Sequence, residues 1–255
     1  MERQPTLDFH RAQFTAVVSD LHLCEAEPVN TKYPLWKKFK TRQFFFDDTF
    51  AAFLKHIREK AGHEPVELIL NGDIFDFDSV MARPEKPSFR FHWLEEKRGL
   101  YPRPERSKFK IQVILRHHHV WVQALRDFIL QGNRAVFIIG NHDLELHFPD
   151  VQAEILAALD LGDAAERVRF CEWFYISNQD TLIEHGNQYD PYCMCEDPVN
   201  PFTQGYNYNS IRLPFGNLAC RYILNGMGFF NPHVESNFIM SLGEYVKFFF
   251  KYIWR

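Results

Sequence analysis

Four short segments combine carboxylate, amide and imidazole side chains, and each follows an apolar run that predicts a β-strand. Carboxylate oxygens and imidazole nitrogens are common ligands of divalent metal ions. Ligands and catalytic groups collect at strand ends in α/β sheets, so the segments together predict a metal site at one edge of a sheet. They are Asp20-Leu21-His22, Asn71-Gly72-Asp73-Ile74-Phe75-Asp76, Gly140-Asn141-His142-Asp143 and His185-Gly186.

The first two segments show how such residues could act. Asp20 and His22 are two positions apart, so in extended backbone they point to one side and could share a metal; a surface turn is the alternative. The carboxylate of Asp73 could bridge two ions, and the preceding glycine would let the backbone approach closely. Asp76 is placed to accept a hydrogen bond behind the ligands. We expect Asp78 to be solvated.

The elements that must position these residues alternate along the chain. Strands are predicted over 14–19, 66–70, 135–139, 168–177 and 181–184, and helices over 44–62, 111–129 and 150–159. The polar stretch 25–43 is predicted to be a loop over the strand ends. The proline- and arginine-rich stretch 79–108 is predicted to be an inserted loop whose arginines could meet a phosphate, although a solvated surface is the simpler interpretation.

A run of three histidines, His117-His118-His119, lies within the predicted helix 111–129. Successive helical residues point about 100° apart, so the three cannot converge on one ion. His118 falls on the apolar face of this helix and is predicted to be a core histidine.

Composition sets broad limits on location and partners. The chain has 255 residues, is 46% hydrophobic and carries a net charge of -4, which gives no general attraction to nucleic acid. Five cysteines without framework spacing favour a reducing compartment. The N-terminal residues lack the apolar stretch of a secretory signal, and no apolar run reaches membrane-spanning length. We therefore predict a cytoplasmic protein.

The four segments, in this order and spacing, resemble four of the five sequence blocks of the calcineurin-like metallophosphoesterases. The resemblance covers Asp20 to Gly186. The Asp-Leu-His-Leu opening, and a His-Gly block followed by a helical stretch, are similar to the UDP-2,3-diacylglucosamine pyrophosphohydrolase branch of this family.

The resemblance implies an α/β fold, a four-layer α/β/β/α sandwich with a C-terminal helical segment, and a dinuclear metal centre. Asp20 and His22 would bind the first metal, Asp73 would bridge both, and Asn141 with His185 would bind the second. Manganese is the expected metal, and iron or zinc would suit the same ligands.

The resemblance also implies a mechanism. Two cations roughly 3.5–4 Å apart would generate a hydroxide at neutral pH and clamp the phosphoryl oxygens during in-line attack. His142 would not bind metal; it would protonate the leaving alkoxide, with Asp76 holding it in orientation.

One family feature is missing from this pattern. The fifth block, Gly-His-x-His, would supply one more histidine to each metal, but after His185 the chain has only His233, in a different context. Either the chain is cut short of that block, or both metals would sit in under-coordinated sites; the end of the chain within a predicted helix favours a truncated domain. We expect a phosphoesterase core over 1–189, with 79–108 inserted, and a helical, aromatic-rich region over 190–255.

Three functions follow, in order of preference. The first is metal-dependent hydrolysis of a phosphomonoester, phosphodiester or pyrophosphate in a phosphorylated small molecule or lipid-linked substrate. A nuclease ranks second, because the chain is slightly acidic and lacks a basic stripe. A catalytically impaired scaffold ranks third: the missing block favours it, whereas His142 and Asp76 oppose it. Residues 229–255 could cover an apolar substrate, pack against other protein, or contact a membrane peripherally.

Overall fold

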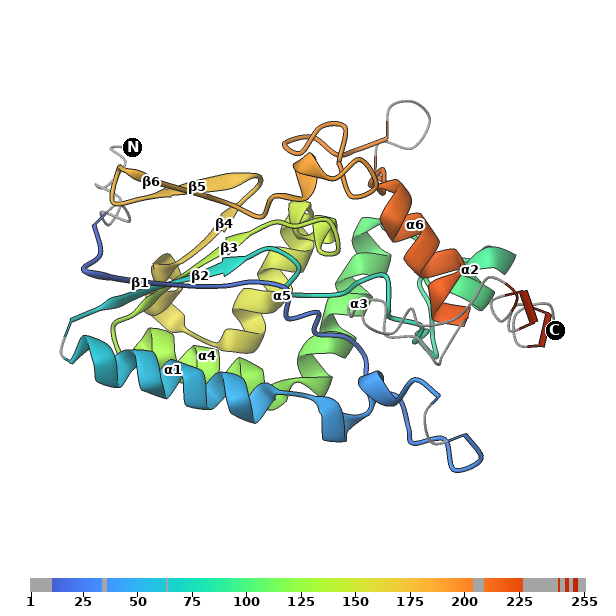
Figure 1. The fold of residues 1–255 in the computed structure, drawn as a ribbon, viewed down its shortest axis with the longest axis horizontal. Helices are drawn as coiled ribbons and strands as arrows, with labels where there is room; N and C mark the ends of the chain where they lie inside the picture. Colours follow the sequence, from blue (N-terminus) through green and yellow to red (C-terminus); the bar gives the residue numbers. More distant parts are fainter. Residues whose placement is uncertain are drawn as a thin grey trace.

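The fold is built on a sheet of four parallel strands (Figure 1). The computed structural model describes residues 11–33, 36–62, 64–203 and 209–226, together with 243, 246–247 and 250–251. The strands lie side by side in chain order. They are β1 (Phe14–Val18), β2 (Val66–Asn71), β3 (Arg134–Ile138) and β4 (Val168–Cys171), and each neighbouring pair is parallel.

Helices cover one face of this sheet (Figure 1). Crossovers between parallel strands are right-handed, so strands in sequential order send their connecting helices to the same face. That face carries α1 (Asp47–Ala61), α4 (His119–Leu130) and α5 (Pro149–Leu159). Helices α2 (Trp93–Arg98), α3 (Pro104–His117) and α6 (Phe215–Tyr222) lie toward the end where the strands point. The 3₁₀ turns are Lys38–Lys40, Arg42–Phe44, Leu144–His147, Gly162–Arg167, Asn187–Tyr189 and Leu224–Gly226.

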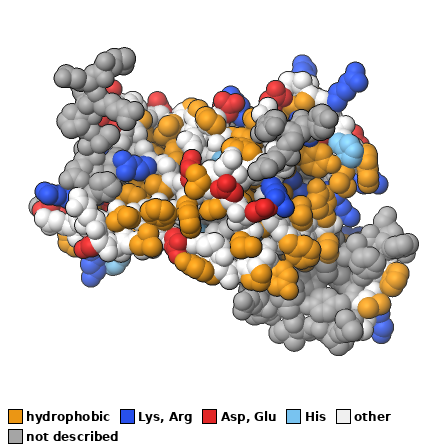
Figure 2. Space-filling view, turned by 90° about the horizontal axis from the view of Figure 1, so that it is seen from above, with side chains coloured by type: hydrophobic (Ala, Val, Ile, Leu, Met, Phe, Trp, Pro, Cys, Tyr) orange, Lys and Arg blue, Asp and Glu red, His pale blue; other side chains and the backbone are white. Residues whose placement is uncertain are grey.

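The other face of the sheet is covered by an antiparallel hairpin, β5 (Phe174–Ser177) with β6 (Thr181–Glu184). Tyr175 packs there against buried side chains of β2 and β3. The outer face of the hairpin exposes Phe174, Ile176 and Leu182, and hydrophobic side chains are spread over this side of the molecule in Figure 2. The predicted α/β class is confirmed. The described residues form a helical layer, the sheet and this hairpin; they do not form a helical layer outside the hairpin.

The core between helices and sheet is rich in aromatic rings. Phe75 stacks on Phe137 with ring centroids 6.2 Å apart, and Phe50 of α1 stacks on Trp121 of α4 at 5.3 Å. The aromatic residue Phe50 of the first predicted helix is therefore part of the core. The predicted end of that helix is also confirmed, because Gly62 follows it with a φ of 65°, a conformation that glycine adopts without strain.

The helix predicted over 111–129 is wrong as a single element. It breaks at His118, whose backbone leaves the helical region with φ -108° and ψ 40°. The imidazole is buried between Asp47, 2.7 Å from Nδ1, and the carbonyl oxygen of Cys24, 2.9 Å from Nε2. These two partners outside the helix account for the break, and the prediction of a satisfied core histidine is confirmed.

Two further expectations need correction. The strand predicted over 168–177 is two strands, because the chain leaves the parallel sheet after Cys171 and enters the hairpin at Phe174. The stretch 79–108 is not merely a solvated loop, since it forms α2 and begins α3. Arg106 within it is buried, with its Nε 2.6 Å from Glu95. A carboxylate within the insertion makes that burial tolerable.

The predictions for the aromatic C-terminal region fall largely outside the described residues. Of 229–255, only 243, 246–247 and 250–251 are described, and His233 is not among them. No helix in the described part of the chain has the length and apolar character needed to cross a bilayer.

Candidate metal centre

All predicted site residues except His185 follow β1, β2 or β3, and these strands end at the same edge of the sheet. Backbone hydrogen bonds join the loops after β1 and β2: Asp20 N donates to Gly72 O over 3.1 Å, and His22 N donates to Asp73 O over 2.9 Å. The loop after β3 is joined through Phe77 N, which donates to His142 O over 3.3 Å. Backbone hydrogen bonds therefore fix the three loops, and the side chains that they carry, relative to one another.

Asp73 lies at the centre of this site. Its Oδ2 is 3.3 Å from Nε2 of His185 and 4.0 Å from Nε2 of His22, while its Oδ1 accepts from the backbone N–H of His142 over 2.8 Å. Two groups of ligand atoms, each within 4.8 Å of one another, share this carboxylate: His22, Asp73 and His142, and Asp20, Asp73 and His185.

The structure thus gathers six of the seven predicted site residues into one cluster. Asp76 joins it beside His142. The seventh, Asn141, follows Gly140 at the end of β3 and is buried, with its amide group turned toward Asn217.

The backbone at this edge adopts conformations that most residues avoid. Asp20, His22 and Asp73 all have positive φ, at 55°, 46° and 53°. Left-handed backbone is unfavourable for residues with a side chain by roughly 1–2 kcal/mol each, and Asp and His tolerate it better than most. Asp20 and His22 are therefore neighbours, with Oδ1 and Nε2 3.9 Å apart, but not through the extended backbone that we predicted. Strain of this kind concentrates at functional sites.

Two glycines make room for the cluster. A Cβ on Gly140 would lie 2.3 Å from Oδ1 of Asp73, and a Cβ on Gly72 would lie 2.4 Å from Nδ1 of His185. Gly72 also has a φ of 77°. Both positions therefore require glycine because Asp73 and His185 occupy the space that a side chain would take.

His185 reaches the cluster from the hairpin, just after β6. Its Nδ1 lies 2.9 Å from the carbonyl oxygen of Asn71, which can only accept, so Nδ1 carries the hydrogen. The ring thereby turns Nε2 toward Asp73, the arrangement seen when an imidazole is held in place for a metal ion. The side-chain amide of Asn71 also donates to Glu184 O over 3.1 Å, which fixes the end of the hairpin to β2.

His142 and Asp76 form a second feature of the site. Nδ1 of His142 is 3.5 Å from Oδ1 of Asp76, and both residues are buried. Asp76 also accepts from the backbone N–H of Ser79 over 3.0 Å and from the Ser79 hydroxyl. Ser79 therefore fixes both oxygens of the carboxylate, and Oδ1 also faces the imidazole.

Charge shifts the proton affinities in the cluster. Burial opposes ionisation of Asp73, but His142, His185 and His22 outweigh it and lower the pKa of this carboxyl. Burial disfavours the charged form of both histidines, yet Asp73, with Asp76 near His142, raises the pKa of His142 to about 10 and that of His185 to about 9. Burial and the charge of Asp73 raise the pKa of Asp143 to about 7. A divalent cation could take over the balancing role of these protons, and the oxygen and nitrogen donors fit such an ion.

A comparison with known protein families identifies the chain at this point. Residues 15–212 match the family model of the calcineurin-like phosphoesterases, well over half of the sequence. The chain belongs to this family. No curated protein matches it. No solved structure matches it either. The chemistry of the calcineurin-like phosphoesterases is metal-dependent phosphoester hydrolysis, and the clusters around Asp73 are compatible with it. The predicted branch within the family stays a prediction.

Several residues at the phosphoesterase site escaped the sequence analysis. Asp143 joins two loops, because its Oδ1 accepts from Gly140 N over 2.7 Å and its Oδ2 from Ile74 N over 2.8 Å. The expectation that Asp78 is solvated is wrong: it is buried and contacts Asn217 and Arg221 of α6. Those contacts span about 140 positions of sequence, and no local pattern indicates them. An aspartate so near the second segment was the available signal.

The site opens to solvent beside Asp20, whose side chain is 56% exposed. A cleft of about 300 Å³ continues from Asp20, His22 and Asp76 to a wall of four phenylalanines. These are Phe39, Phe44, Phe45 and Phe46, of which Phe44 and Phe46 are substantially exposed.

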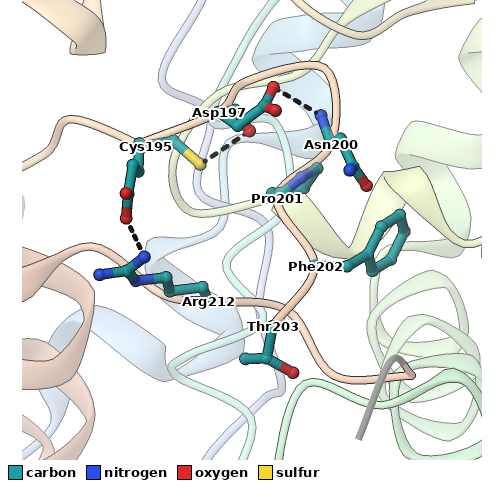
Figure 3. Close-up of a pocket in the computed structure, with 8 residues that line it drawn as sticks. Cys195, Asp197, Asn200, Pro201, Phe202, Thr203 and Arg212 are labelled. Carbon is teal, nitrogen blue, oxygen red and sulfur yellow. Dashed lines mark hydrogen bonds and ion pairs between the residues drawn. The ribbon is translucent and has the colours of Figure 1, made fainter. Parts of the chain in front are cut away.

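A separate cavity of about 530 Å³ lies in the loops after the hairpin (Figure 3). Its polar groups are paired locally: Cys195 Sγ donates to Asp197 O, Asn200 N donates to Asp197, and Arg212 is ion-paired with Glu196. None of the candidate site residues lines it. The hydrogen bonds and the ion pair described for its lining residues hold these loops together.

Proposed function

We propose that this protein is a dinuclear, divalent-metal phosphoesterase that hydrolyses a phosphomonoester, phosphodiester or pyrophosphate, with Mn²⁺ as its cation. The observation that carries the proposal is the place of Asp73 between two imidazoles. Its Oδ2 lies 4.0 Å from Nε2 of His22 and 3.3 Å from Nε2 of His185, so one carboxylate stands between the imidazoles proposed for two different ions.

The proposed ligands divide around that carboxylate. Asp20 and His22 serve one ion, Asn141 and His185 serve the other, and Asp73 serves both. The hydrogen bond from His185 Nδ1 to Asn71 O supports its assignment, because it leaves Nε2 for a cation. Two divalent cations supply Lewis-acid stabilisation of the phosphoryl oxygens and lower the pKa of water.

His142 is the proposed general acid. An alkoxide leaving group needs a proton, and the carboxylate of Asp76 beside Nδ1 favours the protonated form of the His142 imidazole. Asp76 lies 3.5 Å from Nδ1 and orients the ring, so that Nε2 delivers the proton. An acid with its own orienting carboxylate supports an enzyme over a scaffold that has lost activity.

The cleft supports a further feature of the substrate. It leads from Asp20, His22 and Asp76 to the four phenylalanines, so the organic part of a bound phosphoester would lie against aromatic rings. We propose that this part is apolar or aromatic, because such a group loses no hydrogen bonds to water when it enters the cleft.

The test uses chain treated with chelator and then titrated with Mn²⁺, Zn²⁺ or Fe²⁺. Hydrolysis of p-nitrophenyl phosphate and bis-p-nitrophenyl phosphate should return with the metal and be abolished in Asp73→Asn. Asp163→Asn, an exposed aspartate outside the site, is the matched control and should behave as wild type. Metal-independent hydrolysis, or full activity in Asp73→Asn, would overturn the proposal.

A further inference from the structure

Helix α6 buries polar residues and exposes apolar ones, the reverse of an ordinary surface helix. Asn217 is 0% and Arg221 is 1% exposed, whereas Phe215 is 64% and Leu218 is 39% exposed. Asn217 and Arg221 are four positions apart, so they share one face of the helix. Their burial needs partners, and those partners lie at the candidate metal centre.

Asn217 makes three hydrogen bonds that fix its orientation. Its Nδ2 donates to Oδ2 of Asp78 over 2.6 Å and to the carbonyl oxygen of Asn141 over 2.8 Å, and both of these atoms can only accept. Its Oδ1 must therefore face Asn141, from whose Nδ2 it accepts over 3.3 Å. The amide nitrogen of Asn141 is thus committed to Asn217, and Oδ1 is the atom left for a cation.

Arg221 acts on the neighbouring carboxylate. Its Nη2 is 3.1 Å from Oδ1 of Asp78, while Asn217 occupies Oδ2. Asp78 lies 3.8 Å from Nδ1 of His142, hardly farther than Asp76 at 3.5 Å. Helix α6 engages both oxygens of Asp78, whereas Asp76 is held by Ser79 with its Oδ1 nearer to Nδ1 of His142, so Asp76 is the carboxylate that orients the ring. The same engagement argues against a metal ion between Asp76, Asp78 and His142, although their atoms lie close enough for one.

We propose that Asn217 and Arg221 are positioning residues of the phosphoesterase site, a role that rests on the proposed function. Asn217 presents Oδ1 of Asn141 to the second cation, and Arg221 holds Asp78 away from the imidazole of His142. Burying an ion pair costs several kcal/mol per ion, and well-packed apolar residues often stabilise a fold equally well, so stability alone does not account for these side chains.

The first experiment measures Mn²⁺ binding by calorimetry and Mn²⁺ electron paramagnetic resonance. Asn217→Leu should bind one of two cations about 10- to 100-fold more weakly, the usual effect of losing a partner behind a ligand. Asn217→Asp replaces the donor to Asp78 and to the Asn141 carbonyl with a carboxylate oxygen, so it should weaken the same cation site and leave the other unchanged. Leu218→Ala, an exposed change on the same helix, should bind both cations as wild type does.

The second experiment separates the role of Arg221 from folding. Arg221→Met should leave both Mn²⁺ affinities unchanged and lower kcat for p-nitrophenyl phosphate roughly tenfold or more at constant KM, because the acid is misaligned. Arg221→Lys, which keeps the charge beside Asp78, should recover part of kcat.

The outcomes distinguish this inference from the proposed function. A wild-type chain that binds no cation would overturn both. Two wild-type sites, together with two unchanged sites in Asn217→Leu and unchanged kcat in Arg221→Met, would overturn only the role of α6. Equal weakening of both sites in Asn217→Leu and Asn217→Asp, in step with a lower melting temperature, would show a structural role instead.

Discussion

The two ends of β2 each place a carboxylate in the interior, and the two differ in how their oxygens are used. Glu67, near the start of the strand, is fully buried between the sheet and the hairpin. Its oxygens accept from Arg134 Nε at 2.8 Å, Tyr175 Oη at 2.7 Å and Ser177 Oγ at 2.5 Å. Asp73, just after the strand, accepts one backbone hydrogen bond and otherwise faces imidazoles 3.3–4.0 Å away.

The backbone shows the same contrast. Glu67 stands in regular parallel strand, paired with Thr15 and Arg134, whereas Asp73 has a φ of 53°. A buried charge saturated by fixed donors, on relaxed backbone, serves the fold. A buried charge held on strained backbone among groups that can change partners serves chemistry. From this difference we predict that Glu67 is a structural carboxylate and that Asp73, just beyond the strand, is a functional one.

The largest predicted effects separate metal binding, which should depend on Asp73, from stability, which should depend on Glu67. Asp73→Asn keeps the acceptor for His142 N and suits left-handed backbone, so the fold should persist while binding of both metal ions is lost. Glu67→Gln leaves the guanidinium of Arg134 without a carboxylate, which should lower the free energy of unfolding by about 3 kcal/mol, while metal binding stays intact.

Urea unfolding and Mn²⁺ calorimetry on both variants test the separation. If Glu67→Gln lost metal binding without loss of stability, the carboxylate of Glu67 would belong to the site. If Asp73→Asn lost stability and kept metal, the roles of the two ends would be reversed.

The next effect concerns two buried histidines that differ in the same way. His118 is saturated by Asp47 and Cys24 and should be structural, whereas His142 faces the cluster. His142→Gln should lower kcat about 10²- to 10⁴-fold, as expected for loss of a general acid, and keep both metal ions. His118→Gln should lower the melting temperature and leave kcat of the remaining folded enzyme unchanged.

Measuring kcat and the number of bound metal ions for both variants tests whether His142 acts as the general acid. Loss of a metal ion from His142→Gln would make His142 a ligand, consistent with its distance from His22 and Asp73, and would remove it as the acid.

A third prediction concerns the space around Asp73. A methyl group on Gly140 would displace the Asp73 carboxylate, so Gly140→Ala should weaken metal binding about 10- to 100-fold. Gly62→Ala is the control, because that position has open space and a φ of 65°; it should cost about 1 kcal/mol of stability and no metal affinity. Wild-type affinity in Gly140→Ala would mean that the carboxylate can move without consequence.

Sequence reasoning located the strand ends because apolar runs followed by Asp, Asn and His are local patterns. The strands before Asp20, Asp73 and Asn141 lie where they were predicted, and parallel pairing brings their ends together. The site could be assembled from the sequence only because each of its segments carries its own signal.

The unpredicted features depend on contacts between distant segments. Burial of Asp78 depends on Asn217 and Arg221, which stand in an undistinguished stretch of sequence. The break at His118 depends on Cys24 and Asp47. Positive φ at Asp20 and His22 comes from backbone hydrogen bonds to the loop after β2. In each case tertiary partners override what the local pattern favours.

The smallest predicted effect concerns the opening of the site, where the cleft is lined by Asp20 on one side and by phenylalanines on the other. In the proposed complex the apolar part of the substrate would lie against Phe44 and Phe46, which line the cleft, and the phosphoryl group would lie at the metal ions held by Asp73. Phe44→Ala should therefore raise KM several-fold for a naphthyl phosphate, since about 1 kcal/mol of aromatic contact is lost, and leave kcat and Mn²⁺ affinity unchanged. Methyl phosphate, which cannot reach the ring, should show no change in kcat/KM. An equal change for both esters would mean that Phe44 acts through the loop that it belongs to and not through contact with the substrate.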